Sequence, residues 1–238
     1  MRHGGIKRLD WDSDFFNIEA AEISEEITKD TKTLDLQKYD LLVFKHYKDL
    51  NLHIPNFDIQ FQETKVIFSK FFLEASIKNS NVNVLDFDDF PIEKKLLYPL
   101  AFESGKHSRF KLDANIKLER FQLLYKKWVD NSVLKLIADK IFYVMDVNEI
   151  IGFVTVKIIG SYASIGLIAV SEKFQGKGLG KKLLMKVEQF CASEKIFELR
   201  IPTQKENYNA CKFYSSLGYD IVEEIVIKHY WKLDLNTN

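Results

Sequence analysis

The sequence predicts an α/β protein, and three features of its C-terminal half carry that prediction. Apolar side chains recur at steps of three and four from Ile116 onward and indicate an amphipathic helix; they are Leu118, Phe121, Leu124, Tyr125 and Trp128. Two apolar runs, 141–147 and 150–159, are typical of paired strands because only Asn148 and Glu149 separate them. A third run, 163–170, is rich in apolar residues on both faces and predicts a central strand.

The rest of the C-terminal half continues this alternation of strands and helices. The central strand leads through a glycine-rich turn into a helix with one apolar face. A strand is expected over 197–201, followed by a short helix that Gly218 ends and whose apolar residues are Ala210, Phe213, Tyr214 and Leu217. Two more strands are expected over 220–227 and 229–235.

The N-terminal part, up to about Phe90, mixes short strand-like runs at 40–44 and 66–68 with polar connections. Turn-forming residues near its end favour a domain boundary in the region of residues 90 to 115. We therefore expect a smaller N-terminal α/β domain, residues 1–110, that binds the acceptor, and a larger domain, residues 111–238.

Composition limits the classes of function. The chain has 238 residues, of which 46% are apolar, so it has enough material for a buried core. The 34 basic and 34 acidic residues balance, which predicts no general attraction to nucleic acid or to an anionic membrane. Residues 1–10 lack the apolar core of a secretory signal, and no run approaches the roughly 20 apolar residues that span a bilayer. We expect a soluble, cytoplasmic protein.

The cysteines and histidines predict neither a disulfide nor a metal site. Cys191 and Cys211 both lie in stretches of helical periodicity, which suits buried thiols in a reducing compartment. The CxxC and HxxxH spacings of metal ligands are absent from the sequence. No metal is therefore expected.

Residues 175–180, QGKGLG, have the features of a phosphate-binding turn. Glycines at 176, 178 and 180 permit backbone conformations in which several N–H groups converge on an anion. The following helix adds unpaired N–H groups and the positive end of its dipole. Taken alone, however, a GxGxG sequence fits a solvated turn equally well.

Two other phosphate-binding motifs match this segment poorly. A P-loop needs Ser or Thr after its lysine to hold magnesium, and here Lys181 is followed by Lys182. A dinucleotide-binding loop needs GxGxxG and an acidic residue at the end of the next strand. The sequence has GxGxG, and Glu198 lies inside a strand-like run.

Two ordered motifs resemble those of the GNAT acetyltransferases. The segment Gln175 to Gly180 resembles the motif Q/R-x-x-G-x-G/A, and residues 207–219 resemble N-x-x-A-x-x-x-Y-x-x-x-G-F, with Tyr219 in place of Phe. The resemblance covers residues of roughly 116 to 235. It implies a GNAT fold, a mixed and largely antiparallel sheet flanked by helices, and acetyl-CoA or another short acyl-CoA as cofactor.

The resemblance also implies a site. Two adjacent strands, ending near Val170 and Ile201, would separate to admit the cofactor, and the acceptor amine would attack the thioester directly in a ternary complex. The implied cofactor-binding residues are Ile168, Ala169, Val170, Gln175, Gly176, Lys177, Gly178, Leu179, Gly180 and Asn207. Tyr214 would be the general acid that protonates the CoA thiolate. By its spacing alone Tyr214 also fits the apolar core, and Asn207 fits a helix N-cap.

Shorter matches connect the N-terminal half to sugar-nucleotide N-acyltransferases. The segment Trp11 to Phe16 resembles the opening of the dTDP-fucosamine acetyltransferases, and Ser108 to Phe110 also resembles that group. This implies a dTDP-linked amino-dideoxy sugar as acceptor, a role in lipopolysaccharide biosynthesis, and Arg109, Trp11 and Phe16 as substrate-binding candidates. A surface or interdomain salt bridge explains Arg109 equally well, and packing is the more frequent use of aromatic residues such as Trp11 and Phe16.

Other functions and several roles stay open at this stage. The acceptor of a GNAT enzyme is alternatively a protein N-terminus, a lysine or a polyamine, and a GNAT scaffold also serves as a non-catalytic acyl-CoA-binding module. A homodimer is compatible with the sequence. No general base stands out among the candidates His46, His53, His107, Asp12, Asp14, Glu63 and Glu103.

Overall fold

The computed structural model describes residues 5–29, 36–73 and 83–233. In these ranges a single sheet holds ten strands in the order β1-β2-β3-β10-β4-β9-β8-β7-β6-β5. The strands are β1 (Ile6–Arg8), β2 (Ala20–Ile23), β3 (Leu41–His46), β4 (Phe57–Phe71), β5 (Leu85–Asp86), β6 (Lys140–Asp146), β7 (Glu149–Ile159), β8 (Tyr162–Val170), β9 (Glu198–Gln204) and β10 (Asp220–Lys232).

The sheet is mixed and largely antiparallel. Only β2 with β3 and β8 with β9 pair in parallel among the described strands. The other neighbours are antiparallel, including β6 with β7, which a tight turn connects as predicted. The predicted sheet type is therefore confirmed.

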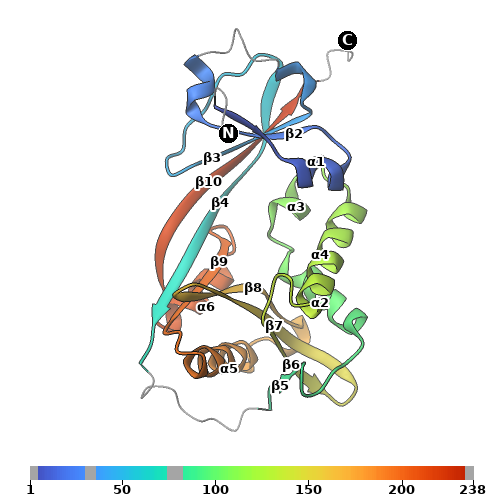
Figure 1. Cartoon of the computed structure of the whole chain (residues 1–238), viewed down its shortest axis with the longest axis vertical. Helices are drawn as coiled ribbons and strands as arrows, with labels where there is room; N and C mark the ends of the chain where they lie inside the picture. The colour runs from blue at the N-terminus through green and yellow to red at the C-terminus, as the bar shows by residue number, and fades with distance from the viewer. Residues whose placement is uncertain (1–4, 30–35, 74–82, 234–238) are drawn as a thin grey trace.

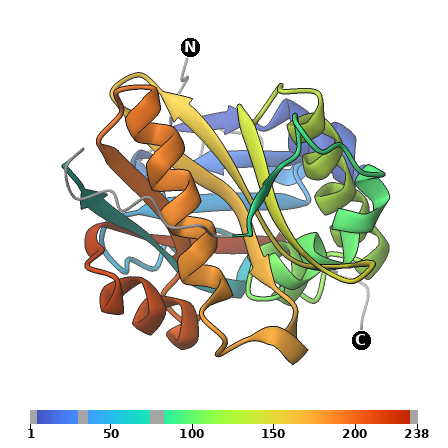
Figure 2. The ribbon, with the colours of Figure 1, turned by 90° about the horizontal axis from the view of Figure 1, so that it is seen from below.

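Helices cover both faces of the C-terminal strands. The helices of the described chain are α1 (Asp10–Phe16), which lies beside β2, and α2 (Tyr98–Ser104), α3 (Arg109–Leu112), α4 (Leu118–Val133), α5 (Leu179–Ser193) and α6 (Tyr208–Ser216), with short 3-10 turns η1 (Glu25–Lys29), η2 (Leu36–Lys38), η4 (Lys94–Leu97) and η5 (Glu172–Phe174). Figure 2 shows α5 on one side of β6 to β8 and the segment α2 to α4 on the other. Strand β6 alternates accordingly: Phe142 and Val144 join the core under α5, and Ile141 and Tyr143 join the core under α2 and α4.

The long strands β4 and β10 connect the two ends of the molecule (Figure 1). Strand β10 comes from the C-terminal half yet pairs with β3 and β4 of the N-terminal half, and β4 pairs in turn with β9. The expected domains 1–110 and 111–238 thus share one sheet, and residues 110 and 111 both lie inside α3.

The expectation of two strands over 220–227 and 229–235 is wrong, because β10 runs unbroken from Asp220 to Lys232. The lysine between the two apolar runs, Lys228, is fully buried and not at a turn. Its ammonium donates to the carbonyl oxygen of Leu50 at 2.8 Å and pairs with Asp49 at 2.5 Å. A loop distant in sequence thus supplies the partners that allow a charge inside the strand. Residues 234–238 lie outside the described part of the chain.

The cysteines are free, as expected, and differ in burial. Cys191 on α5 is fully buried, and burial raises the pKa of its thiol to about 12. Cys211 on α6 is only partly buried. The prediction of buried thiols is therefore correct for Cys191 and wrong for Cys211.

Candidate active site

Strands β8 and β9 pair for a short length and then separate. Only Ala163 with Leu199 and Ser164 with Arg200 are paired, although β8 continues to Val170 and β9 to Gln204. Residues 165–170 therefore present an edge without a strand partner on the β9 side. We call the space between the two separated strand ends the wedge.

Proline at position 202 suits the β9 side of the wedge. Strand β9 extends through Pro202, beyond the predicted end at Ile201. The amide of Lys205 donates to the carbonyl of Thr64 on β4 at 2.8 Å. In an antiparallel ladder, residues whose amides face the partner strand alternate with residues whose amides point away from it, and Pro202 is three positions before Lys205. The nitrogen of Pro202 accordingly faces away from β4 and into the wedge, where its missing N–H leaves no ladder bond broken.

The glycine turn lies directly after β8 and opens α5. Gly176 and Gly178 have φ angles of 74° and 77°, a backbone region that glycine adopts without strain. A Cβ built at either position meets no described atom within 4 Å, so their outer surface is open to a ligand. Gly178 is the N-cap of α5 and provides no side-chain cap, which leaves the first N–H groups of a 15-residue helix available.

The flanking side chains hold the turn in place and add positive charge. Gln175 donates from Nε2 to the carbonyl oxygen of Val170 at 2.9 Å, which ties the turn to the end of β8. Lys177 lies 4.6 Å from the centre of the Phe174 ring. Lys181 and Lys182 are exposed on the first turn of α5. This combination of open glycines, helix start and lysines fits the diphosphate of a coenzyme A molecule.

Asn207 and Tyr214 both belong to α6, which follows β9. Asn207 is its N-cap and accepts a hydrogen bond from the amide of Ala210 at 3.3 Å, as its spacing predicted. Tyr214 is 5% exposed and packs in the core, with ring centres 5.5 Å from Phe68 and 6.3 Å from Tyr219. Burial raises the pKa of Tyr214 well above its usual value, so the phenol is neutral and keeps its proton.

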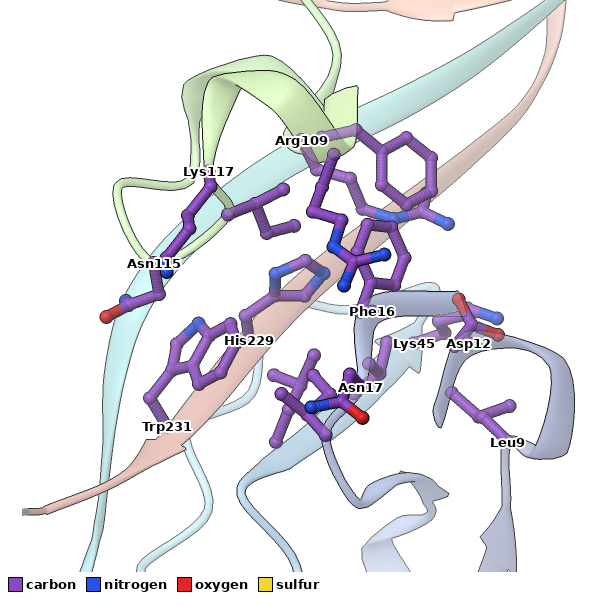
Figure 3. Close-up of a pocket in the computed structure, with 16 residues that line it drawn as sticks. Leu9, Asp12, Phe16, Asn17, Lys45, Arg109, Asn115, Lys117, His229 and Trp231 are labelled. Atoms are coloured by element: carbon purple, nitrogen blue, oxygen red, sulfur yellow. The ribbon is translucent and has the colours of Figure 1, made fainter. Parts of the chain in front are cut away.

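A cavity of about 310 Å³ lies where the N-terminal strands meet α1, α3 and β10 (Figure 3). We call it the cationic cavity, because four basic residues and one acidic residue line it. These are Lys45, Arg109, Lys117, Arg120 and Asp12. The remaining lining residues are Leu9, Phe16, Asn17, Ile18, Leu41, Val43, Phe110, Asn115, Ile116, His229 and Trp231.

A buried histidine of the cavity lining, His229, pairs with a buried aspartate, Asp113. His229 Nδ1 lies 2.6 Å from Oδ2 of Asp113, and both side chains are almost fully buried. The same carboxylate accepts hydrogen bonds from Nε1 of Trp231 at 2.9 Å and from the amide of Asn115 at 3.0 Å. Figure 3 shows Arg109 on one side of the His229 ring and Trp231 on the other.

Glu63 and Arg109 form a second buried pair beside the cavity. Arg109 lies 3.6 Å from Oε1 of Glu63, whose side chain is 4% exposed. Oε2 of Glu63 is buried and has no hydrogen-bond partner among the described residues. Burial raises the pKa of Glu63, and the nearby Arg109 opposes that rise. Glu63 lies on β4, two residues before Lys65, which pairs with Gln204 at the end of β9.

Of the three substrate-binding candidates, two line the cationic cavity and one does not. Phe16 lines the cationic cavity and stacks on Phe110, with ring centres 5.8 Å apart. Trp11 is not among the lining residues; it is 45% exposed and stacks on Phe15 at 4.8 Å. Arg109 lines the cavity, and its ion pair with Glu63 is internal and not at the surface.

Sequence reasoning missed His229 and Asp113, which are 116 positions apart in the chain. His46, His53 and His107, which it considered, do not line the cationic cavity. No local spacing joins His229 to Asp113, and the only sequence signal was a polar residue inside an apolar strand. In the described ranges, no group of three or more His, Cys, Asp or Glu side chains is arranged to hold a metal ion.

Comparison with known proteins supports this arrangement at the level of fold. Residues 110–219, slightly less than half of the chain, match the model of the Acetyltransferase (GNAT) family. The structure superposes over 98% of its length on a GNAT-family protein from Novosphingobium aromaticivorans, covering 91% of that chain, with a TM-score of 0.58 and 12% identity. The chain has the GNAT fold.

Two further similarities extend this result. A functionally unknown conserved protein from Staphylococcus epidermidis superposes over 98% of this chain and 93% of its own, with a TM-score of 0.60 and 10% identity. In sequence, the uncharacterized protein YxbD of Bacillus subtilis is 31% identical over 74 residues, or 31% of this chain. The match spans 45% of YxbD, less than half the length of that curated relative. The wedge and the glycine turn both lie within the matched residues 110–219.

Proposed function

We propose that this chain is an acyl-CoA-dependent N-acyltransferase that binds its donor in the wedge. The observation that carries the proposal is that the unpaired edge of β8, the glycine turn and the start of α5 lie next to one another. The edge formed by Ile168, Ala169 and Val170 offers backbone groups to the amides of a pantetheine arm, as to an added strand. Residues 175–180 hold the diphosphate, and Asn207 contacts the arm from the start of α6.

The chemistry assigned to the chain's own groups is modest. Bound acyl-CoA supplies an activated thioester. A backbone N–H at the wedge stabilises the negative charge that develops on the carbonyl oxygen. Tyr214 is neutral, as a general acid must be, and protonates the departing thiolate. Glu63, the buried partner of the cavity-lining Arg109, takes up the proton of the acceptor amine.

The acceptor we propose is a nucleotide-linked, dTDP-type amino-dideoxy sugar bound at the cationic cavity. Four basic side chains against one acidic side chain favour an anionic acceptor and disfavour a polyamine. Arg109 matches the geometry of phosphate oxygens, and Phe16 and Trp231 provide apolar surface for a ring. The donor is an intracellular metabolite, so we propose that the reaction takes place in the cytoplasm.

Release of free CoA tests the function directly. We expect purified protein, incubated with acetyl-CoA and a panel of dTDP-amino sugars, to release thiol at a rate that depends on the sugar. Acetyl-CoA alone, and acetyl-CoA with spermidine or a peptide amine, serve as controls. Thiol release in the presence of spermidine or the peptide, together with no release in the presence of any of the sugars, would contradict the proposed acceptor. Absence of acetyl-CoA binding by calorimetry would contradict the function itself.

A further inference from the structure

His229 presents an unsatisfied nitrogen to the cationic cavity. Its side chain is 2% exposed and lines the cavity, and Nε2 is buried without a hydrogen-bond partner in the part of the chain that the structure describes. Buried polar atoms in folded proteins are nearly always paired, so an unpaired one beside a cavity indicates a position that a ligand completes.

The surroundings of Asp113 determine which form of the imidazole faces the cavity. The Asp113 carboxylate accepts from Trp231 Nε1 and from the Asn115 amide, so its oxygens act as acceptors and His229 Nδ1 donates the proton between them. Burial and the charge of Arg109 lower the pKa of His229, although Asp113 opposes them. The imidazole is therefore neutral, and Nε2 carries a lone pair that accepts a hydrogen bond.

The rest of the cavity selects for negative charge. Arg109 stacks on Phe110 at 4.4 Å, which leaves the edge of its guanidinium toward Glu63 and the cavity. Arg120 donates to the carbonyl of Phe15 at 3.0 Å, and Lys45 pairs with Glu22 at 2.6 Å. These contacts hold basic side chains of the cavity lining in place, so an anion that enters finds preformed partners.

We propose that His229, held by Asp113, is a specificity-determining residue of this cavity: Nε2 accepts a hydrogen bond from a hydroxyl or amino group of a phosphorylated acceptor whose phosphate lies against Arg109. The inference rests on the proposed function in treating the cavity as the acceptor site. At about 310 Å³ the cavity is at the small end of ligand sites, so it encloses the sugar and phosphate end of the acceptor and not the whole molecule.

Binding of dTDP-glucose, which has the phosphates and hydroxyls but no amine to acylate, tests the inference without turnover. We expect wild-type protein to bind it in calorimetry and not to bind glucose. His229→Ala removes the acceptor atom and should weaken binding about tenfold, the effect of one lost buried hydrogen bond. His229→Gln places a carbonyl oxygen near the position of Nε2 and should stay within about threefold of wild type. His46→Gln, a histidine outside the cavity, is the matched control.

Imidazole ¹⁵N spectra give a second readout that a purely structural role would not move. We expect His229 to be neutral with its proton on Nδ1, and its Nε2 resonance to shift when dTDP-glucose is added. Equal loss of binding in His229→Ala and His229→Gln with the fold intact, an unshifted Nε2 resonance, or no binding of dTDP-glucose to wild type would overturn the inference.

The two proposals fail in distinguishable ways. Binding of dTDP-glucose that depends on His229, together with no binding of acetyl-CoA, would retain this inference and refute the acyltransferase. Acyl transfer to a different acceptor that is insensitive to His229→Ala would retain the acyltransferase and overturn this inference.

Discussion

Tyr214 is deeply buried, and its phenol is protonated before the thiolate departs, which is the starting state of the proposed acid role. We expect Tyr214→Phe to lower kcat by about 10² to 10⁴, the contribution of a general acid, and to leave the Kd for CoA within a factor of about two. The ring contacts with Phe68 and Tyr219 persist in this variant, so stability should change little. Steady-state kinetics and calorimetry measure the two effects.

Tyr219→Phe is the matched control, because it removes a buried phenol of the same cluster whose hydroxyl donates to Glu188 at 2.9 Å. It should cost about 1 kcal/mol of stability and leave kcat unchanged. A Tyr214→Phe enzyme with the kcat of wild type, or with CoA affinity reduced as much as kcat, would remove Tyr214 from the acid role.

Burial of the ionised Glu63 side chain lowers the stability of the fold at neutral pH, and its proposed role is proton transfer. Its folded-state pKa is raised by burial, so its contribution to stability is present below its unfolded pKa of about 4.5 and is lost as the pH rises. Glu63→Gln, which does not ionise, should therefore raise the unfolding free energy at pH 7 by about 1 kcal/mol, or the Tm by about 2 to 4 °C. It should also lower turnover.

Glu206→Gln is the control for Glu63→Gln. Glu206 accepts from the amide of Thr64, the residue after Glu63, but its side chain is exposed. Thermal melts should show no gain in stability for this variant. A Glu63→Gln protein that is less stable than wild type at pH 7 would show that the ion pair with Arg109 outweighs the cost of burial.

At the scale of elements, the glycine turn and α5 together form the proposed anion site. Gly178→Ala strains a backbone at φ 77° and places a methyl group on the surface that faces the proposed diphosphate. We expect a Kd for CoA at least about tenfold weaker, with a loss of stability of about 1 kcal/mol.

Gly160→Ala is the control that separates the effect of backbone strain from the effect on CoA binding. It has a φ of 60° and open space around it, and it lies in the turn between β7 and β8, outside the wedge. Gly160→Ala should cost similar stability in urea unfolding and leave CoA binding unchanged. If both variants lost CoA affinity equally, the effect would come from destabilisation and not from the turn.

For the whole molecule, the bond between His229 and Asp113 joins the C-terminal strand to the segment after α3, and the burial of His229 makes stability depend on pH. The pKa of His229 is lowered in the folded state, so unfolding takes up a proton as the pH falls through its unfolded pKa of about 6.5. Stability should therefore fall below that pH, with a slope from this group of at most about 1.4 kcal/mol per pH unit.

Urea unfolding at pH 7.5, 6.5 and 5.5 measures this slope. His229→Gln removes the titrating group and should flatten the dependence over this range. The pKa of Asp113 is also lowered, but its contribution is lost only at lower pH, near and below its unfolded value of about 3.8. Identical pH profiles for wild type and His229→Gln would refute the assignment of the slope to His229.

The elements around the glycine turn could be predicted from the sequence, because each depends on the spacing and type of residues that are close together in the chain. Apolar spacing located α4 within two residues of its start, and the order of strand, glycines and helix located the anion turn at 175–180. Positive φ angles at Gly176 and Gly178 are a property of single residues, and so is the N-cap at Asn207.

The cationic cavity, our proposed acceptor site, follows from tertiary contacts and not from local sequence. The cationic cavity brings Lys45, Arg109 and His229 together from three distant parts of the chain, and Lys228 is buried only because a loop near residue 50 supplies its partners. Contacts between β10 and the N-terminal strands arise from sheet order, which no local pattern encodes. Periodicity predicts which face a residue occupies, and long-range pairing decides what that face meets.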